Sequence, residues 1–215
     1  MQDIILFGIQ WSGKWTQCRN LMQEYANQIT YFESWTILRA LKSNDNPIWN
    51  YVKSIVDQGI YLPDEFLIGV FDLFMQVIQP NQMMLLDWFP RRLGQMHMYL
   101  ERIQKQQRSI VWIYLELDTQ IAINRLSIRR ICPTCNSISS ASESTPFPVC
   151  SKCQTPMIQR IDDTPEAIAK RIDQYFKETE PVLTYFRQHN WLVTIDANQK
   201  EQKVFEDITN VLKNI

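Results

Sequence analysis

Residues 3–16 read DIILFGIQWSGKWT, a short apolar run followed by a loop that contains Gly8 and Gly13 and then by the start of a helical stretch. This order predicts a strand, a loop and a helix. Such a loop can wrap phosphates, because its backbone N–H groups and the helix N-terminus attract anions. Lys14 would then contact the phosphates, and Thr16 would hold magnesium or a phosphate oxygen. On these residues alone, a strand–helix turn with an exposed lysine is an equal alternative.

Further apolar runs lie at residues 83–86, 110–117 and 191–195, with helix-like periodicity between them. Strands that alternate with helices predict an α/β fold in which a parallel sheet is covered on both faces. Thr164 followed by a proline predicts the start of a helix, which a second proline, Pro181, must break or kink.

The bulk composition limits the kind of partner. A chain of 215 residues with 45% hydrophobic residues suits one compact domain with small insertions. Its net charge of -1 argues against a basic surface for nucleic acid or membrane, so we expect a small-molecule partner. The amino terminus lacks a basic segment followed by an apolar one, and no run reaches the roughly 18 apolar residues of a bilayer span. We therefore expect a cytoplasmic protein.

Four of the five cysteines form two tight pairs, in the pattern Cys132-x2-Cys135-x14-Cys150-x2-Cys153. In a reducing compartment this spacing predicts one tetrahedral structural zinc site, with a disulfide pair as the alternative. The fifth, Cys18, is interpreted as a small buried apolar residue. The segment around the pairs is polar and proline-bearing, which indicates an inserted subdomain.

The cysteine pairs could also belong to a zinc ribbon that binds nucleic acid or a partner protein. The segment between the pairs contains no arginine or lysine, and its only aromatic residue is Phe147. It therefore offers little for phosphate contact or base stacking.

A second motif, LDWFPR at residues 86–91, is followed by Gln95. It resembles the adenylate kinase signature Asp-Gly-Phe-Pro-Arg, with only the glycine replaced. The segments SWTILR (34–39) and DQGIYLPDE (57–65) are similar to the family's Thr-Gly-Asp-Met-Leu-Arg segment and to its monophosphate-binding loop. Arginine-rich stretches at 125–132 and 160–171 match the family's lid hinges, so the resemblance covers essentially the whole chain.

The resemblance implies a P-loop core with a five-stranded parallel sheet over residues 1–32, 63–127 and 164–215. It implies a helical insertion for the nucleoside monophosphate (NMP) at 33–62 and a zinc-stapled lid at 128–163. The implied activity is reversible phosphoryl transfer from ATP to AMP with Mg2+, giving two ADP, in adenine nucleotide homeostasis by a monomer. The alternative is a kinase for another nucleoside monophosphate, which Gln95 and the cysteine pairs disfavour.

The same resemblance assigns site residues, position by position. Guanidinium forks suit phosphoryl transfer, which spreads negative charge over several oxygens. The implied catalytic residues are Lys14, Asp87, Arg91, Arg129, Arg160 and Arg171. The implied ATP-binding residues are Trp11, Ser12, Gly13, Lys14, Trp15, Thr16, Arg125, Arg129, Ile138, Ser139 and Gln199. The implied AMP-binding residues are Ser34, Arg39, Ile60, Tyr61, Leu62, Trp88, Phe89, Pro90, Arg91, Gln95, Arg160 and Arg171.

The chain contains five glycines and seven tryptophans, whereas glycine alone usually makes up roughly 7% of a protein. Five of these tryptophans stand where the family has glycine: Trp11, Trp15, Trp35, Trp49 and Trp88. Trp191 is interpreted in the same way, and Trp112 is left undecided. Because one residue type recurs at sites of one other type, we infer that these codons are UGA, read as glycine in the source organism.

The rival interpretation is a pseudoenzyme with literal indoles in its nucleotide sites, acting as a scaffold or binding protein. A phosphate loop needs close backbone approach and at places positive φ, which costs a non-glycine residue about 1 to 2 kcal/mol. We therefore expect the chain as written to fold around its sheet and zinc but to bind nucleotides poorly.

Overall fold

The structure is a computed structural model that describes residues 2–40, 46–56, 61–142, 144–160 and 163–214. A five-stranded sheet lies at its centre, in the order β2-β3-β1-β4-β7, and every neighbouring pair is parallel. This confirms the predicted parallel α/β core. The strands are β1 (Asp3–Gly8), β2 (Ile29–Phe32), β3 (Met83–Asp87), β4 (Ile110–Glu116) and β7 (Leu192–Asp196).

Strands β1 and β3 are buried along their whole length, because helices cover both faces of the sheet. This explains why β1 and β3 read as continuous apolar runs. The edge strand β2 did not stand out as such a run, since Thr30 and Tyr31 are only half-buried.

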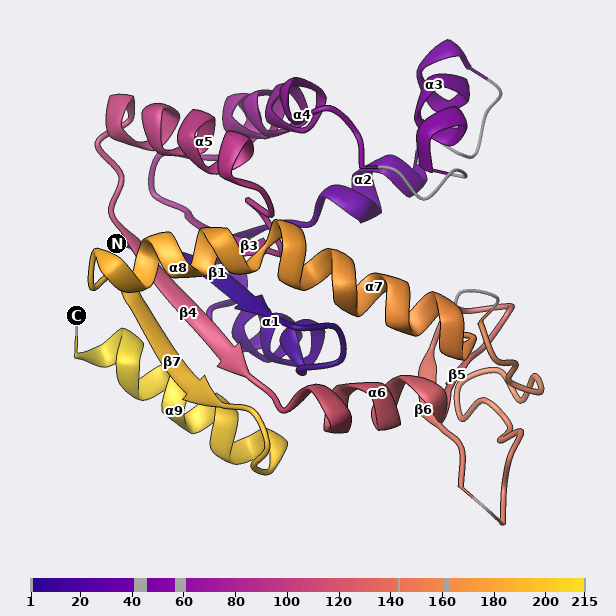
Figure 1. Cartoon of the computed structure of the whole chain (residues 1–215). Coiled ribbons are helices and arrows are strands. Elements are labelled where there is room, and N and C mark those ends of the chain that lie inside the picture. The colour runs from indigo at the N-terminus through magenta and orange to yellow at the C-terminus, as the bar shows by residue number, and fades with distance from the viewer. Residues whose placement is uncertain (1, 41–45, 57–60, 143, 161–162, 215) are drawn as a thin grey trace.

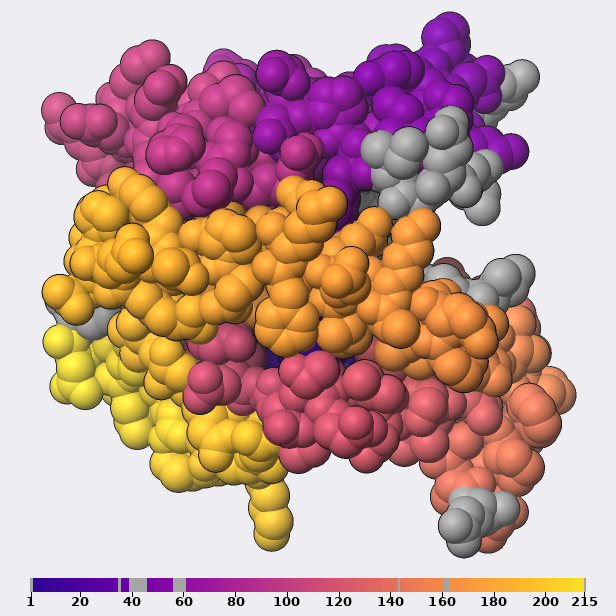
Figure 2. Space-filling view, in the orientation of Figure 1, coloured from indigo at the N-terminus to yellow at the C-terminus, as the bar shows by residue number. Residues whose placement is uncertain are grey.

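The helices form two layers around the sheet (Figure 1). Helices α1 and α9 contact one another on one face, and α5 contacts α8 on the other. In Figure 2, α7 and α8 form a band across the visible face, between α5 and α6. The helices are α1 (Lys14–Glu24), α2 (Ser34–Ala40), α3 (Pro47–Val56), α4 (Asp64–Val77), α5 (Leu93–Lys105), α6 (Thr119–Ser127), α7 (Pro165–Glu178), α8 (Glu180–Gln188) and α9 (Glu201–Lys213), with a 3-10 turn at Ala26–Gln28. None of the described helices is long and apolar enough to cross a membrane.

The predicted helix that begins after Thr164 is confirmed, together with its break. The Thr164 side chain accepts a hydrogen bond from the Ala167 N–H and caps α7. The helix ends at Glu178, and α8 begins on the other side of Thr179, with Pro181 in its first turn.

Two segments lie away from the sheet. Helices α2 and α3 lie above α7 in the view of Figure 1, and a small antiparallel pair lies beyond the end of α6. This pair consists of β5 (Arg129–Ile131) and β6 (Ile138–Ser140).

An aromatic cluster joins the sheet to α5 and α8. The Trp112 ring in β4 lies 4.1 Å from Phe186, 5.9 Å from Tyr99 and 6.1 Å from Phe7, measured between ring centroids. Trp112 is 5% exposed, so its indole is part of the core. Cys18 is also buried, as predicted.

Candidate functional site

The loop that follows β1 closes around a buried ammonium group. The Lys14 Nζ donates to the carbonyl oxygens of Gly8 and Ile9 at 2.7 and 3.0 Å and lies 3.5 Å from Ser12 Oγ. Gly13 caps α1 with a φ of 90°, a conformation that glycine adopts without strain. The positive charge is therefore held at the N-terminus of a helix, where phosphates bind.

A second loop follows β3, the neighbour of β1 in the sheet. Leu6 and Asp87 are partners in the register of the two strands, so both loops leave the same edge. The Arg91 Nε donates to the Trp88 carbonyl at 2.9 Å, and the Arg91 N–H donates to Gln95 Oε1 at 2.9 Å. Gln95 donates in turn to Asp64 at the start of α4, at 3.0 Å. These bonds fix the arginine close to Lys14.

The Trp88 indole contacts both cations. Its ring centroid is 3.9 Å from the Arg91 guanidinium carbon and 4.8 Å from the Lys14 Nζ. The residue has a φ of 61°, and its buried Nε1 has no hydrogen-bond partner within the described part of the chain.

Trp11, in the loop that follows β1, also has positive φ and also contacts an arginine. Its φ is 66°, and its ring centroid lies 5.2 Å from the Arg129 guanidinium carbon. The Trp11 carbonyl lies 3.4 Å from the Arg125 Nη1, which donates to it. Two of the predicted lid-hinge arginines thus converge on this loop.

Burial controls the protonation of the groups at this edge. Burial lowers the pKa of Lys14 to about 8, although nearby Asp87 opposes the shift. Burial also raises the pKa of Asp87, against the favourable charge of Lys14, and the Tyr31 hydroxyl donates to this carboxylate at 3.1 Å. For Arg91, burial lowers the pKa, and Tyr61 and Asp87 oppose the change.

Asp163 joins two of the predicted arginines and was not itself predicted as a site residue. Its fully buried carboxylate accepts two hydrogen bonds from Arg129, one of them from Nε at 2.6 Å, and one from Arg171 at 3.1 Å. Asp64 and Tyr31 were not predicted as site residues either. No local motif marks any of these three residues, because their contacts are with segments distant in the sequence.

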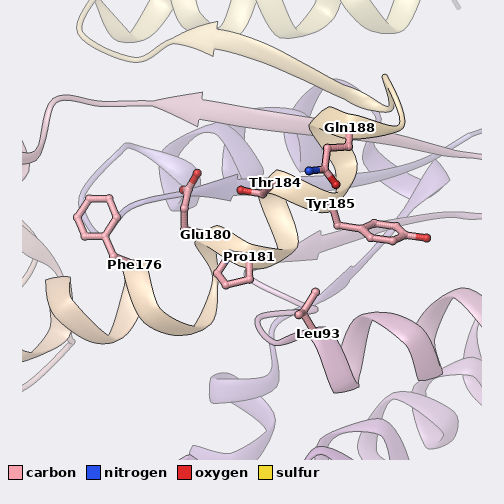
Figure 3. A pocket seen from close by; sticks show the side chains of 7 residues that line it. All are labelled: Leu93, Phe176, Glu180, Pro181, Thr184, Tyr185 and Gln188. Atoms are coloured by element: carbon pink, nitrogen blue, oxygen red, sulfur yellow. The ribbon is translucent and has the colours of Figure 1, made fainter.

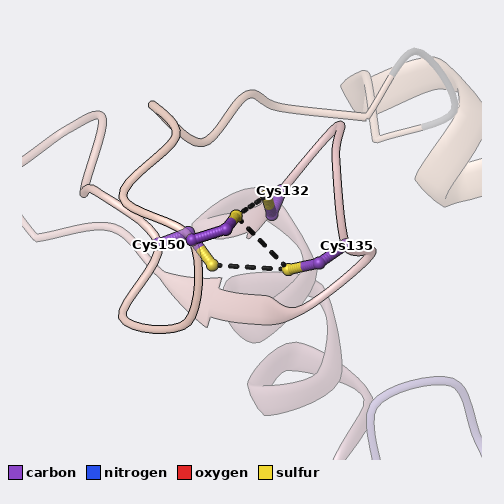
Figure 4. Close-up of side chains that lie close together, drawn as sticks. Cys132, Cys135 and Cys150 are labelled. Carbon is purple, nitrogen blue, oxygen red and sulfur yellow. Dashed lines mark hydrogen bonds between the residues drawn. The ribbon is translucent and has the colours of Figure 1, made fainter.

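The four paired cysteines come together in the segment beyond α6. Their sulfur atoms all lie within 4.8 Å of one another (Figure 4, in which three of the four are labelled). The shortest sulfur contacts are 3.3 Å between Cys132 and Cys153 and 3.5 Å between Cys135 and Cys150. These distances are far longer than a disulfide bond, and all the cysteines are free thiols. The cluster can hold a metal ion.

The two cysteine turns repeat one geometry. The Asn136 N–H donates to the Cys132 carbonyl at 3.0 Å, and the Gln154 N–H donates to the Cys150 carbonyl at 2.9 Å. Asn136 and Gln154 both adopt positive φ, at 57° and 59°. Each turn therefore aims two sulfur atoms at a common point, an arrangement suited to tetrahedral coordination.

The comparison with known proteins identifies the family. A family model described as adenylate kinase matches residues 6–191. The chain belongs to the adenylate kinase family. An adenylate kinase of Chlamydia trachomatis serovar L2 is 33% identical over 222 residues, covering 97% of this chain and 89% of the relative. Adenylate kinases of Clostridium tetani and Petrotoga mobilis are 30% and 29% identical, and each alignment covers 98% of this chain. The two alignments cover 98% and 97% of the lengths of these relatives.

The other residues assigned from the adenylate kinase resemblance have varied surroundings. Ser12, Ser34, Leu62 and Phe89 are buried, whereas Trp15 is 52% exposed. Thr16 is half-buried, and Arg39 belongs to α2. The Arg160 carbonyl accepts a hydrogen bond from the Asp163 N–H, and Ile60 lies outside the described residues.

Two residues assigned to ATP, Ile138 and Ser139, lie on β6, where Ile138 is 44% exposed. A third, Gln199, follows β7 and donates to Asp207 at 2.7 Å.

Of two cavities, one borders the loop that follows β1 and the other does not. One of about 360 Å³ borders the first loop through Ile9 and reaches the ends of β4 and β7 through Glu116 and Asn198. It therefore lies at the carboxyl edge of the sheet, where ligands of α/β folds bind. Another of about 400 Å³ lies along α8 and the start of α5 (Figure 3), lined by Leu93, Phe176, Glu180, Pro181, Thr184, Tyr185 and Gln188. None of these residues belongs to the loops that follow β1 and β3.

Proposed function

We propose that the encoded protein catalyses reversible transfer of the γ-phosphoryl group of ATP to AMP, giving two ADP. The observation that carries the proposal is the convergence of Lys14, Asp87 and Arg91 at the ends of two adjacent strands. Cations and a carboxylate at this edge of an α/β sheet suit the binding and alignment of a polyphosphate.

The residues of this site supply positioning and charge. Lys14 would neutralise the phosphates of ATP, and Arg91 would hold the monophosphate of the acceptor. Arg129 and Arg171, whose side chains Asp163 orients, would stabilise the negative charge that develops on the transferred group. Aligning the reactants in this way lowers the barrier without a covalent intermediate.

Magnesium, when bound with ATP, would neutralise phosphate charge. Asp87 fits this ion, because its buried Oδ1 has no hydrogen-bond partner among the described residues, and carboxylate oxygen is a preferred magnesium ligand. Thr16 lies in the first helical turn and is the second candidate.

We propose further that the four cysteines bind a structural zinc ion. Thiolates are the ligands that zinc prefers in closed tetrahedral sites, and the sulfur spacing suits such a shell. The segment 128–163 would then form a stapled lid, and 33–62 the monophosphate-binding insertion of a monomeric enzyme. Both would close over the nucleotides and exclude water.

The test is an ADP-forming assay with ATP, AMP and Mg2+. It compares the chain as written with a version that carries glycine at positions 11, 15, 35, 49, 88 and 191 and keeps Trp112, because that indole is part of the core. We expect activity in the glycine version, and a preference for AMP over UMP, CMP and GMP. A folded, zinc-loaded glycine version without activity would contradict the proposal and favour the pseudoenzyme.

A further inference from the structure

The Trp88 indole lies where a phosphate would meet its cations. An aromatic ring presents a negative face, and this one lies 3.9 Å from the Arg91 guanidinium carbon and 4.8 Å from the Lys14 Nζ. Lys14 follows β1 and Arg91 follows β3, its neighbour in the sheet, so the ring contacts cations from two segments that leave the same edge. An anion bound by both cations would have to displace it.

The Trp11 indole stands in the same relation to the lid-hinge arginines. Its ring lies 5.2 Å from the Arg129 guanidinium carbon, and the backbone of this residue accepts a hydrogen bond from Arg125. Each of the two indoles therefore lies on a cation assigned to phosphate.

The backbone at both positions is of the kind that favours glycine. Trp11 and Trp88 have φ values of 66° and 61°, in the left-handed region where a side chain is strained. The Trp88 Nε1 is also buried without a partner within the described ranges. A tryptophan that stabilises a fold normally satisfies this donor.

Trp112 provides the contrast within the same chain. It lies in extended β4, and three aromatic rings pack against it. The indole at this position contributes to the core, whereas those at positions 11 and 88 oppose their own backbone.

We propose that the indoles of Trp88 and Trp11 occupy the phosphate site, and that glycine at these two positions opens it to a nucleoside triphosphate. The inference rests on the proposed function, because it takes Lys14, Arg91 and Arg129 as phosphate ligands. It goes beyond that function because it assigns the obstruction of the phosphate site to Trp11 and Trp88, two of the seven tryptophans.

The experiment compares three zinc-loaded full-length chains: the chain as written, the double variant Trp11→Gly/Trp88→Gly, and the control Trp191→Gly. Trp191 is 43% exposed and lies just before β7, outside both loops. Calorimetric titration with MgATP should show at least about tenfold tighter binding by the double variant than by the chain as written. The control should stay within about twofold of the chain as written. Measurable binding of MgATP with the same affinity by all three chains would overturn the inference and leave the proposed function standing.

A second measurement does not depend on nucleotide binding. Lys14 is 6% exposed beneath the Trp88 ring, so an acylating reagent should modify it slowly in the chain as written and at least about tenfold faster in the double variant. Peptide mass analysis gives the extent of modification at Lys14 over time. If Lys14 becomes reactive but MgATP does not bind, the indoles cover the ammonium as proposed and the proposed function fails. If the reactivity of Lys14 is unchanged, the inference is wrong.

Discussion

At the scale of single residues, Asp163 has the most demanding position in the site. Its carboxylate is fully buried between Arg129, whose side chain is 7% exposed, and Arg171. A buried charge is tolerated only when it is paired and hydrogen-bonded. Asp163 therefore holds the side chains of Arg129 and Arg171 in place.

We expect Asp163→Asn to lower the free energy of unfolding by about 3 kcal/mol, because it leaves the buried Arg129 guanidinium without its counter-charge. Urea denaturation measures the loss. The matched control is Asp72→Asn, which breaks a pair with Arg102 whose side chains are 31% and 45% exposed. That change should cost about 1 kcal/mol or less. Similar losses in the two variants would show that the Asp163 pair is not buried.

Lys14 makes the stability of the chain depend on alkaline pH. Burial lowers its pKa from 10.5 to about 8, so between these values the unfolded chain binds more protons than the folded chain. The free energy of unfolding should therefore rise with pH in this window, by up to about 1.4 kcal/mol per pH unit from this group. Below about pH 8 both states keep the proton, so this group adds no pH dependence and the cost of burying its charge stays constant.

The measurement compares the chain as written with Lys14→Met from about pH 8 to about pH 10 by urea denaturation. The difference between the two chains isolates the lysine, because all other titrating groups are shared. The variant should lack the rise. Parallel curves would mean that Lys14 is solvated in the folded protein.

At the scale of elements, the cysteine turns combine local sequence with a contact across the lid. After each pair, a residue with positive φ, Asn136 or Gln154, donates its N–H to the carbonyl of the first cysteine and closes the turn. The isolated bridge between Ile131 and Ile158 then holds the strand before the first turn beside the chain after the second. This pairing brings the two cysteine turns together in one cluster.

We expect Cys150→Ser to lose the zinc ion and to lower the melting temperature, because three thiolates no longer close the tetrahedral shell. Cys18→Ala is the control, since Cys18 is buried beside the first loop and contributes no sulfur atom to the cluster. Elemental analysis gives the zinc content, and a chelator should lower the melting temperature of every chain except Cys150→Ser. Equal zinc in the two variants would exclude the cluster as the metal site.

At the scale of the whole molecule, the tryptophans separate by their surroundings. Positions 11 and 88 have glycine-like backbone, Trp15 and Trp191 project into solvent, and Trp112 is packed in the core. We infer that a single cause, translation of UGA as tryptophan, would account for the tryptophans at positions where the family resemblance implies glycine, whereas the packing of Trp112 in the core needs no such cause.

We therefore expect the gene to carry UGA at positions 11, 15, 35, 49, 88 and 191, and UGG at position 112. Gene sequencing reads the codons, and mass analysis of the protein from its source organism should show glycine at position 88. UGG codons at positions 11, 15 and 88 would refute the recoding account. UGA at position 112 would refute only the separation of that residue from the others.

The sequence by itself determined the parallel sheet, the break between α7 and α8 and the cysteine cluster. These features follow from local patterns: apolar runs buried on both faces, a proline that cannot continue a helix, and paired thiols within a turn. It also indicated the cations of the site through motifs that span a few residues each.

Only the tertiary structure decided which groups meet. Lys14 and Trp88 lie on loops far apart in the chain, and Asp163 reaches Arg129 across the whole cysteine segment. Likewise, the core role of Trp112 depends on rings from β1, α5 and α8. Contacts of this kind depend on the packing of distant elements, and burial and charge pairing act only after that packing has formed.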